Sequence, residues 1–237
     1  MDWNNDGLQD MVVGDGPGYI HLYLNKGTGS MPELDSGSHI EAGGVPINVG
    51  GRAAPAVDDW NGDGKKDLLV GNFDGYIKVF LNEGTEEVPL FSSSYNLKFS
   101  NGEEVKIGTR AAPRIFDWDR DGLKDLLAGE FEGNIYFLRN KGTNNNPVFD
   151  SSDKLLLTTG EPLLYFGKGG GHRTRLTVSD WNNDGLYDII AGGTDGRVMI
   201  FAGSSEPLLI SVMDRFWLTE VGERINRRLR RLRGSDE

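Results

Sequence analysis

Short apolar runs recur along this chain at nearly constant intervals, and each follows a polar, acidic stretch. The runs cover residues 11–13, 68–70, 126–128 and 189–191, and each is followed by glycine. Behind them come Gly- and Asn-containing turns and then segments, such as residues 76–81, with alternating apolar and polar positions. Alternation is typical of a half-buried strand. A short apolar run is typical of a strand that is covered on both faces. The pattern therefore predicts many short strands separated by Gly, Asn, Asp and Pro.

The polar stretch before each apolar run is a nonapeptide with the pattern Asp-Trp-Asn/Asp-x-Asp-Gly-x-x-Asp. Its four copies begin at Asp2, Asp59, Asp117 and Asp180, so that successive copies are 57, 58 and 63 residues apart. A repeat of about sixty residues that holds about four predicted strands corresponds to one blade of a β-propeller. We expect an all-β fold in which residues 1–213 form four blades, the first of them incomplete because no strand precedes its nonapeptide.

Residues 214–237 leave the repeat. Apolar residues recur there at helical spacing among seven arginines and five acidic residues, which predicts a short C-terminal amphipathic helix. Such a basic helix either docks on the acidic body, or caps an open sheet edge, or contacts a membrane surface or a partner. Docking or capping is the favoured role.

The nonapeptide has the spacing of a loop that encloses a metal ion. In a tight loop the side chains at positions 1, 3 and 5 turn their oxygens toward one centre, position 7 offers its backbone carbonyl, and Gly at position 6 permits the turn. Position 9 adds another carboxylate. Oxygen ligands without His or Cys favour Ca²⁺ over zinc or copper, and Mg²⁺ prefers to keep its water. An EF-hand would need Glu at position 12 and flanking helices, whereas Val or Ala stands there in this sequence.

Composition and charge agree with this interpretation. The chain has 237 residues, 34 of them glycine, and a formal net charge of −11, which makes nucleic acid a poor partner. Thirteen carboxylates occupy positions 1, 3, 5 and 9 of the four loops, where divalent cations would relieve their mutual repulsion. The absence of cysteine excludes a disulfide scaffold and any Cys-ligated metal site. The sequence shows no signal peptide and no apolar stretch of the roughly 18 residues that span a bilayer.

Three features together resemble the FG-GAP (VCBS-type) repeat family: the acidic loop, the apolar-apolar-Gly element behind it, and the Ala-Ala-Pro element before it. Repeats of this family build the propellers of integrin α subunits, Ca²⁺-dependent fungal lectins and many bacterial surface proteins. The resemblance covers about residues 1–213 and implies up to one Ca²⁺ per copy. The implied ligands are Asp2, Asn4, Asp6, Leu8 (carbonyl) and Asp10; Asp59, Asn61, Asp63, Lys65 (carbonyl) and Asp67; Asp117, Asp119, Asp121, Leu123 (carbonyl) and Asp125; and Asp180, Asn182, Asp184, Leu186 (carbonyl) and Asp188.

The resemblance implies a calcium-binding, non-catalytic propeller module for extracellular protein or carbohydrate binding and adhesion, in an extracellular, cell-surface or periplasmic setting. The alternative is an accessory or catalytic propeller of a secreted polysaccharide lyase or hydrolase. The sequence holds no nucleophile elbow, phosphate-binding loop or HExxH motif. The binding module is therefore the favoured interpretation.

Candidate ligand contacts lie in the loops behind the apolar-Gly element, because these loops vary between copies on a repeated frame. Phe73 and Phe131 are the first choices. The Trp at position 2 of every nonapeptide would stack on sugar rings in a lectin, or pack against the neighbouring blade. A Trp repeated beside a structural metal site favours packing.

Four blades in an incomplete ring leave sheet edges that need a cover. Three arrangements supply one: the chain is a fragment of a longer propeller, or two copies associate through their open blade edges into one ring, or the C-terminal tail seals a four-bladed ring. The first is the favoured expectation.

Overall fold

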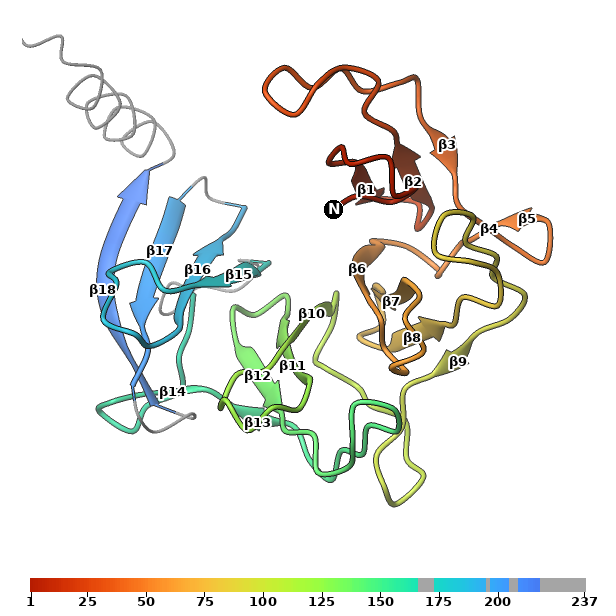
Figure 1. The fold of residues 1–237 in the computed structure, drawn as a ribbon. Helices are drawn as coiled ribbons and strands as arrows, with labels where there is room; N and C mark the ends of the chain where they lie inside the picture. Colours follow the sequence, from red (N-terminus) through yellow and green to blue (C-terminus); the bar gives the residue numbers. More distant parts are fainter. Residues whose placement is uncertain (166–172, 195–196, 205–208, 218–237) are drawn as a thin grey trace, which may run out of the picture.

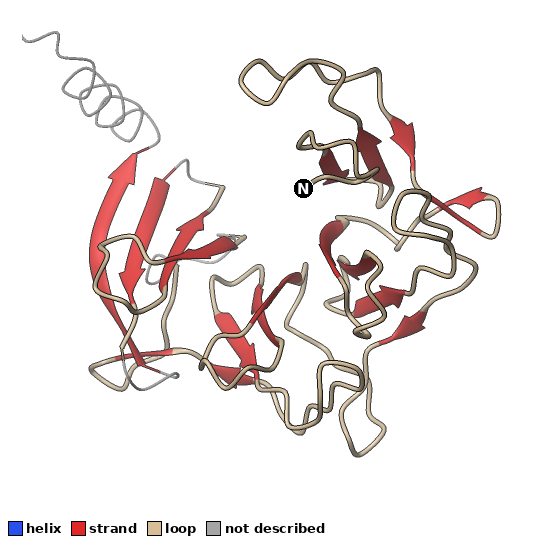
Figure 2. Cartoon of the chain, in the orientation of Figure 1, coloured by secondary structure: helices blue, strands red, loops and turns tan. Residues whose placement is uncertain are grey.

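The structure, a computed structural model, describes residues 1–165, 173–194, 197–204 and 209–217. All regular structure in these residues is β-strand, which confirms the expected all-β fold (Figure 2). The same residues contain no helix that is long and apolar enough to cross a membrane.

Four sheets follow one another around a common centre, one for each nonapeptide, and we call them blades 1 to 4 (Figure 1). Blade 1 consists of β1 (Met11–Gly14), β2 (Ile20–Tyr23) and β3 (Ser38–His39). Blade 2 consists of β6 (Ala54–Asp58), β7 (Asp67–Gly71), β8 (Ile77–Phe80) and β9 (Tyr95–Asn96). Blade 3 consists of β10 (Ala112–Phe116), β11 (Asp125–Gly129), β12 (Ile135–Leu138) and β13 (Asp153–Lys154). Blade 4 consists of β15 (Arg175–Ser179), β16 (Asp188–Gly192), β17 (Arg197–Ala202) and β18 (Leu209–Trp217), with β14 (Leu156–Leu157) added in parallel to β18. A small hairpin of β4 (Glu41–Ala42) and β5 (Val45–Pro46) lies between blades 1 and 2 in the sequence.

The strands β6, β10 and β15 lie nearest the centre and contact one another from blade to blade (Figure 1). Each runs through the segment before a nonapeptide and pairs with the apolar run after it, as the sequence predicts. In blade 2, Ala54 lies opposite Gly71 and Asp58 lies opposite Asp67. The nonapeptides of blades 2 to 4 therefore connect these two strands at one end of the blade, which we call the loop face. The opposite end, the arginine face, carries the residues just before the inner strands, Arg52, Arg110 and Arg173.

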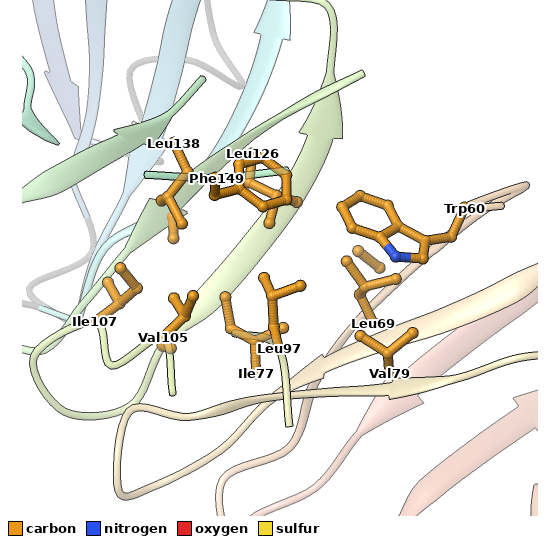
Figure 3. Close-up of a cluster of buried hydrophobic side chains, with 13 residues drawn as sticks. Trp60, Leu69, Ile77, Val79, Leu97, Val105, Ile107, Leu126, Leu138 and Phe149 are labelled. Atoms are coloured by element: carbon orange, nitrogen blue, oxygen red, sulfur yellow. The ribbon is translucent and has the colours of Figure 1, made fainter. Parts of the chain in front are cut away.

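The hydrophobic cores lie between adjacent blades, because the second strand of a blade is covered on both faces. All five residues of β7 are buried. Leu68 and Val70 pack with residues of blade 1, whereas Leu69 packs with residues of blade 3. Figure 3 shows the core between blades 2 and 3, which also contains Trp60 and Phe149. Burial on both faces explains why this strand reads as a continuous apolar run in the sequence.

The glycine that ends each of the first three apolar runs marks a close approach between blades. A Cβ added to Gly71 would lie 2.1 Å from the carbonyl oxygen of Ala111 in blade 3. A Cβ on Gly14 would lie 2.2 Å from the carbonyl oxygen of Ala53 in blade 2. Any side chain at these positions would push the neighbouring inner strand away. The recurring apolar-apolar-Gly element therefore permits the blades to pack.

The end of the last blade differs from the expectation. The sequence predicts that the repeat ends at residue 213, but β18 continues to Trp217 and pairs with β17. The backbone of residues 214–217 thus finds its hydrogen-bond partners in a neighbouring strand instead of in a helix. The rest of the predicted C-terminal helix, residues 218–237, lies outside the described residues.

Candidate metal centres

Each nonapeptide is a tight loop held by its own carboxylates. In the second loop, Asp59 accepts hydrogen bonds from the backbone N–H groups of Asp63 and Gly64, both at 3.0 Å. Asp63 in turn accepts one from Lys65 N–H, also at 3.0 Å. The first and fourth loops repeat all three bonds, and the third repeats those to its glycine and to position 7. The loops therefore adopt one conformation that turns several carboxylate oxygens inward.

Position 4 of every loop has a left-handed backbone. The residues there are Asn5 (φ 57°), Gly62 (71°), Arg120 (61°) and Asn183 (59°). Asn and Gly tolerate this conformation best, which explains their presence in three of the four copies.

The aspartate at position 9 has a role that sequence reasoning missed. Asp67 is fully buried, and its two oxygens accept hydrogen bonds from the backbone N–H groups of Trp60 (2.9 Å) and Asn82 (2.7 Å). Asp10, Asp125 and Asp188 make the equivalent pair of bonds. This residue therefore ties the loop to the end of the third strand of its blade. The sequence signal was the Asn-x-Gly-Thr element, which starts 15 residues after the aspartate in the first three copies.

The third loop has oxygens that lack any partner within the protein. Carboxylate oxygens of Asp117, Asp119 and Asp125 lie within 4.8 Å of one another. Among the described residues, this is the only group of three acidic side chains that are close enough to share a metal ion. The Oδ1 atoms of Asp117 and Asp119 are buried and accept no hydrogen bond. Buried oxygens without a donor are unfavourable, and a cation bound between them would remove that cost. An all-oxygen set with three carboxylates fits Ca²⁺. In the other three loops position 3 is Asn, so one carboxylate fewer is present.

Basic side chains compensate part of this acidity. Arg139 Nε lies 2.6 Å from Asp119 Oδ2, and Arg139 Nη2 lies 3.5 Å from Asp121 Oδ2. The side chain of Arg139 is 51% exposed, so it has room to swing away when a cation enters. Burial raises the pKa of Asp119, and the positive charge of Arg139 only partly opposes this. In the second loop Lys65 Nζ lies 3.5 Å from Asp63 Oδ2.

The buried carboxylates give the cation-free protein a pH dependence. Burial, opposed in part by backbone hydrogen bonds, raises the pKa of Asp125 to about 7, and the pKa of Asp67 is raised for the same reason. Between the unfolded pKa of 3.8 and this value the folded state binds more protons than the unfolded state, so stability falls as pH rises through that window. We expect the urea midpoint in metal-free buffer to be higher near pH 5 than near pH 8. Millimolar Ca²⁺ removes this difference, and a metal-free midpoint that rises with pH would contradict the prediction.

Adjacent loops contact each other through position 8. Lys66 Nζ in the second loop donates to Asn5 Oδ1 in the first at 2.8 Å. Lys124 in the third loop donates to Asp58 Oδ1 at 2.7 Å and to the carbonyl oxygen of Asp59. In the fourth loop the ring of Tyr187 takes this place, with the guanidinium carbon of Arg120 4.1 Å from its centroid. The order of one loop therefore supports the next.

The position 2 tryptophans of the first three loops are packed between blades and not offered to solvent. Trp60 is 2% exposed and stacks on Phe149 of blade 3 with ring centroids 6.0 Å apart. Trp3 contacts Phe91 of blade 2 with its ring tilted by 47°, and the ring centroids lie 6.4 Å apart. Trp118 is also buried. Trp181 differs, since it is 48% exposed.

Phe73 and Phe131, the candidate ligand contacts, lie on the arginine face. Both rings contact the guanidinium group of Arg110, at 5.3 Å and 4.2 Å from the ring centroids. The polar residues before them are used inside the protein: Asn72 and Glu130 accept hydrogen bonds from backbone N–H groups within their own turns. A ligand role for the two phenylalanines stays a prediction.

Comparison with known proteins gives distant relatives. No family model matches the chain. Cartilage acidic protein 1 of Xenopus tropicalis is 26% identical over 193 residues, which are 78% of this chain and 27% of that protein. Integrin alpha-4 of Xenopus laevis is 27% identical over 55% of the chain and 14% of its own length. Integrin alpha-7 of Mus musculus is 29% identical over 66% and 13%. The chain spans about a quarter or less of these relatives, and the similarity supports a propeller-like repeat family.

Proposed function

We propose that this chain is a calcium-stabilised, non-catalytic propeller module of an extracellular or cell-surface protein, and that it binds a protein partner. The observation that carries the calcium part is the pair of buried, donor-free oxygens of Asp117 and Asp119 in an all-oxygen loop. The similarity to integrin alpha chains supports the adhesion-type setting. Carbohydrate binding is the other form of the same proposal.

The geometry of the loops supports a structural role for the ion. In blades 2 to 4 the loop connects the inner strand to the second strand, and its last aspartate ties it to the third strand. A cation held there fixes three strands of a blade at once. Lys66 and Lys124 each donate a hydrogen bond to the preceding loop or its strand, so that an ordered loop also stabilises its neighbour. Calcium would therefore stabilise the scaffold and leave the opposite face for a partner.

The first test is a calorimetric titration with Ca²⁺ on metal-free protein. We expect binding with a Kd of about 10⁻³ to 10⁻⁵ M, and binding of Mg²⁺ weaker by about tenfold or more, because Mg²⁺ dehydrates reluctantly and is seldom held by protein ligands alone. Solid-phase binding to extracellular-matrix proteins and to a glycan array, each with Ca²⁺ and with EDTA, tests the partner. Absence of Ca²⁺ binding at millimolar concentration, or ligand binding that is stronger with EDTA, would refute the proposal.

A catalytic role in a polysaccharide lyase or hydrolase is the second candidate. The observation that favours it is a cavity on the arginine face that is lined by four arginines and by Asp15, which pairs with His21 at 3.0 Å. Arginines can hold the carboxylates of an acidic sugar polymer, and an imidazole can accept a proton. Release of new reducing ends from polygalacturonate, lost in His21→Ala, would establish this role.

A further inference from the structure

Five arginines gather at the arginine face, near the centre of the molecule. Arg52, Arg110 and Arg173 stand directly before the inner strands of blades 2, 3 and 4. Arg114 and Arg175 lie on the inner strands themselves. Arg175 takes a position that is a buried alanine in blades 2 and 3. The repeat thus brings one guanidinium group from each of blades 2, 3 and 4 to this face. Arg114 and Arg175 stand at positions where the other blades have no arginine, and they add two more.

The backbone at three of these arginines is strained. Arg52, Arg110 and Arg173 have φ values of 54°, 57° and 43°, in the left-handed region. Their N–H groups are held there by the preceding blade, since they donate to the carbonyl oxygens of Gly16, Phe73 and Phe131. Glycine would occupy this conformation without strain. Arginine at all three positions indicates that the side chain itself is needed.

The arginines have no carboxylate partners among the described residues, although the chain carries a net charge of −11. Nη1 of Arg175 is buried and has no hydrogen-bond partner. Burial, together with the neighbouring positive charges of Arg173 and Arg114, lowers the pKa of Arg175 to about 10. Clustered, desolvated cations are unfavourable until an anion neutralises them.

The acidic residue beside the cluster is already engaged. Oδ1 of Asp15 accepts hydrogen bonds from the N–H groups of Gly18 and Tyr19, both at 2.7 Å, and its Oδ2 lies 3.0 Å from His21 Nε2. Asp15 lines the same cavity but its oxygens are used within its own turn, and it forms no ion pair with the arginines.

One of the five arginines has a clear structural role. Arg114 donates to the carbonyl oxygens of Leu176 in blade 4, at 3.1 Å, and Pro55 in blade 2, at 3.4 Å. It joins three inner strands. Within the described part of the chain, the side chains of Arg52, Arg173 and Arg175 form no hydrogen bond or ion pair, and all three line the same space.

That space is a cavity of about 370 Å³, lined by Arg52, Arg114, Arg173 and Arg175 together with β1 and the segment that follows it. Its volume lies in the range of pockets that hold small ligands or single side chains. Arg110 does not line this cavity; its guanidinium group contacts the rings of Phe73 and Phe131, at 5.3 Å and 4.2 Å from their centroids. Aromatic contacts orient a guanidinium group without neutralising it.

We propose that this arginine cavity binds the carboxylate side chains of an acidic peptide segment in a protein partner. The proposal rests on the proposed function, in which the partner is a protein, and it names the chemistry of that partner. Guanidinium groups bind carboxylates through paired N–H···O contacts, and the planar fork of Arg suits this geometry better than Lys. Since the chain carries a net charge of −11, an acidic segment is repelled by much of it and attracted to basic regions, of which this cavity is one and the arginine-rich residues 214–237 are another.

The experiment measures binding of a fluorescently labelled octa-aspartate peptide by anisotropy, in a buffer with excess Ca²⁺. We expect binding that weakens with salt. The double variant Arg52→Gln/Arg173→Gln should weaken it by about tenfold or more. Lys98→Gln/Lys154→Gln is the matched control: it removes the same two positive charges from exposed residues and should change the affinity by less than about twofold. Melting temperatures of the arginine variants should stay equal or rise, because neutralisation relieves repulsion.

Polygalacturonate and inorganic phosphate are added as competing arms. The proposal is supported if unlabelled octa-aspartate displaces the labelled peptide. Polygalacturonate and phosphate, added at the same total concentration of negative charge, should displace little of it. Absence of peptide binding, binding that Arg52→Gln/Arg173→Gln does not weaken, or tight binding of polygalacturonate or phosphate in place of the peptide would each overturn it. Calcium dependence of the melting temperature is recorded on the same samples, so that failure of the calcium scaffold is seen separately from failure of the anion cavity.

Discussion

Removal of divalent cations is expected to lower the melting temperature of this protein by about 10–20 °C or more. A site whose Kd is 100-fold below the free Ca²⁺ concentration stabilises the folded state by about 2.7 kcal/mol. Two such sites therefore contribute about 5 kcal/mol, and 1 kcal/mol shifts the melting temperature of a chain of this size by about 2–4 °C. Thermal unfolding followed by circular dichroism with EDTA, and again after excess Ca²⁺ is restored, measures the effect.

Contacts between neighbouring loops should add to this loss of thermal stability. Lys66 and Lys124 link each loop to the one before it, so that loss of order in one loop removes contacts from its neighbour. Unfolding with Ca²⁺ should accordingly be steeper than unfolding with EDTA. Restoration by Mg²⁺ should be weak. A melting temperature that is indifferent to both EDTA and Ca²⁺ would show that the loops are stable without cations.

The second large effect is expected from the buried aspartates at position 9. Asp67→Ala leaves the N–H groups of Trp60 and Asn82 without their acceptor in a buried place. Each such loss costs about 1–3 kcal/mol, and the relief of a buried negative charge offsets part of it. We expect Asp67→Ala to lower the free energy of unfolding by about 2–4 kcal/mol both in Ca²⁺ and in EDTA. Urea denaturation under the two conditions measures it.

The matched variant is Asp63→Ala in the same loop. Asp63 is a candidate ligand whose side chain is 34% exposed, and its only backbone partner is Lys65 N–H. Its removal should cost stability in Ca²⁺ but little in EDTA. Asp67→Asn, which keeps one acceptor oxygen, should fall between Asp67→Ala and the unchanged protein. If Asp67→Ala lost stability only in Ca²⁺, position 9 would be a ligand alone and the anchoring role would be wrong.

Much of the site was predictable because it is local. Asp59, Asp63 and Gly64 interact within one tight loop, so that their spacing in the sequence largely sets their spacing in space. The same holds for the apolar runs, whose burial on both faces follows from their composition. The packing of the tryptophans was also readable, since an aromatic repeated in every copy is more easily explained by a repeated neighbour than by a repeated ligand.

Other features could not be read from local spacing. Arg139 is 20 residues from Asp119, and nothing in either segment indicates that they form an ion pair. The second role of Asp67 depends on Asn82, which belongs to another strand. The strand that continues to Trp217 was missed because its partner β17 supplies a ladder that helical spacing cannot reveal.

The sequence alone determined that this is a repeated all-β chain with four acidic loops suited to Ca²⁺, since repeats and tight loops depend on contacts between near neighbours in the chain. The tertiary structure alone decided that the arginines of three successive blades converge on one cavity. Arg52, Arg114 and Arg173, which line it, are about sixty residues apart in the sequence. Only the rotation of each blade about a common centre brings them together, and that rotation is set by packing between blades, as at Gly71 against Ala111.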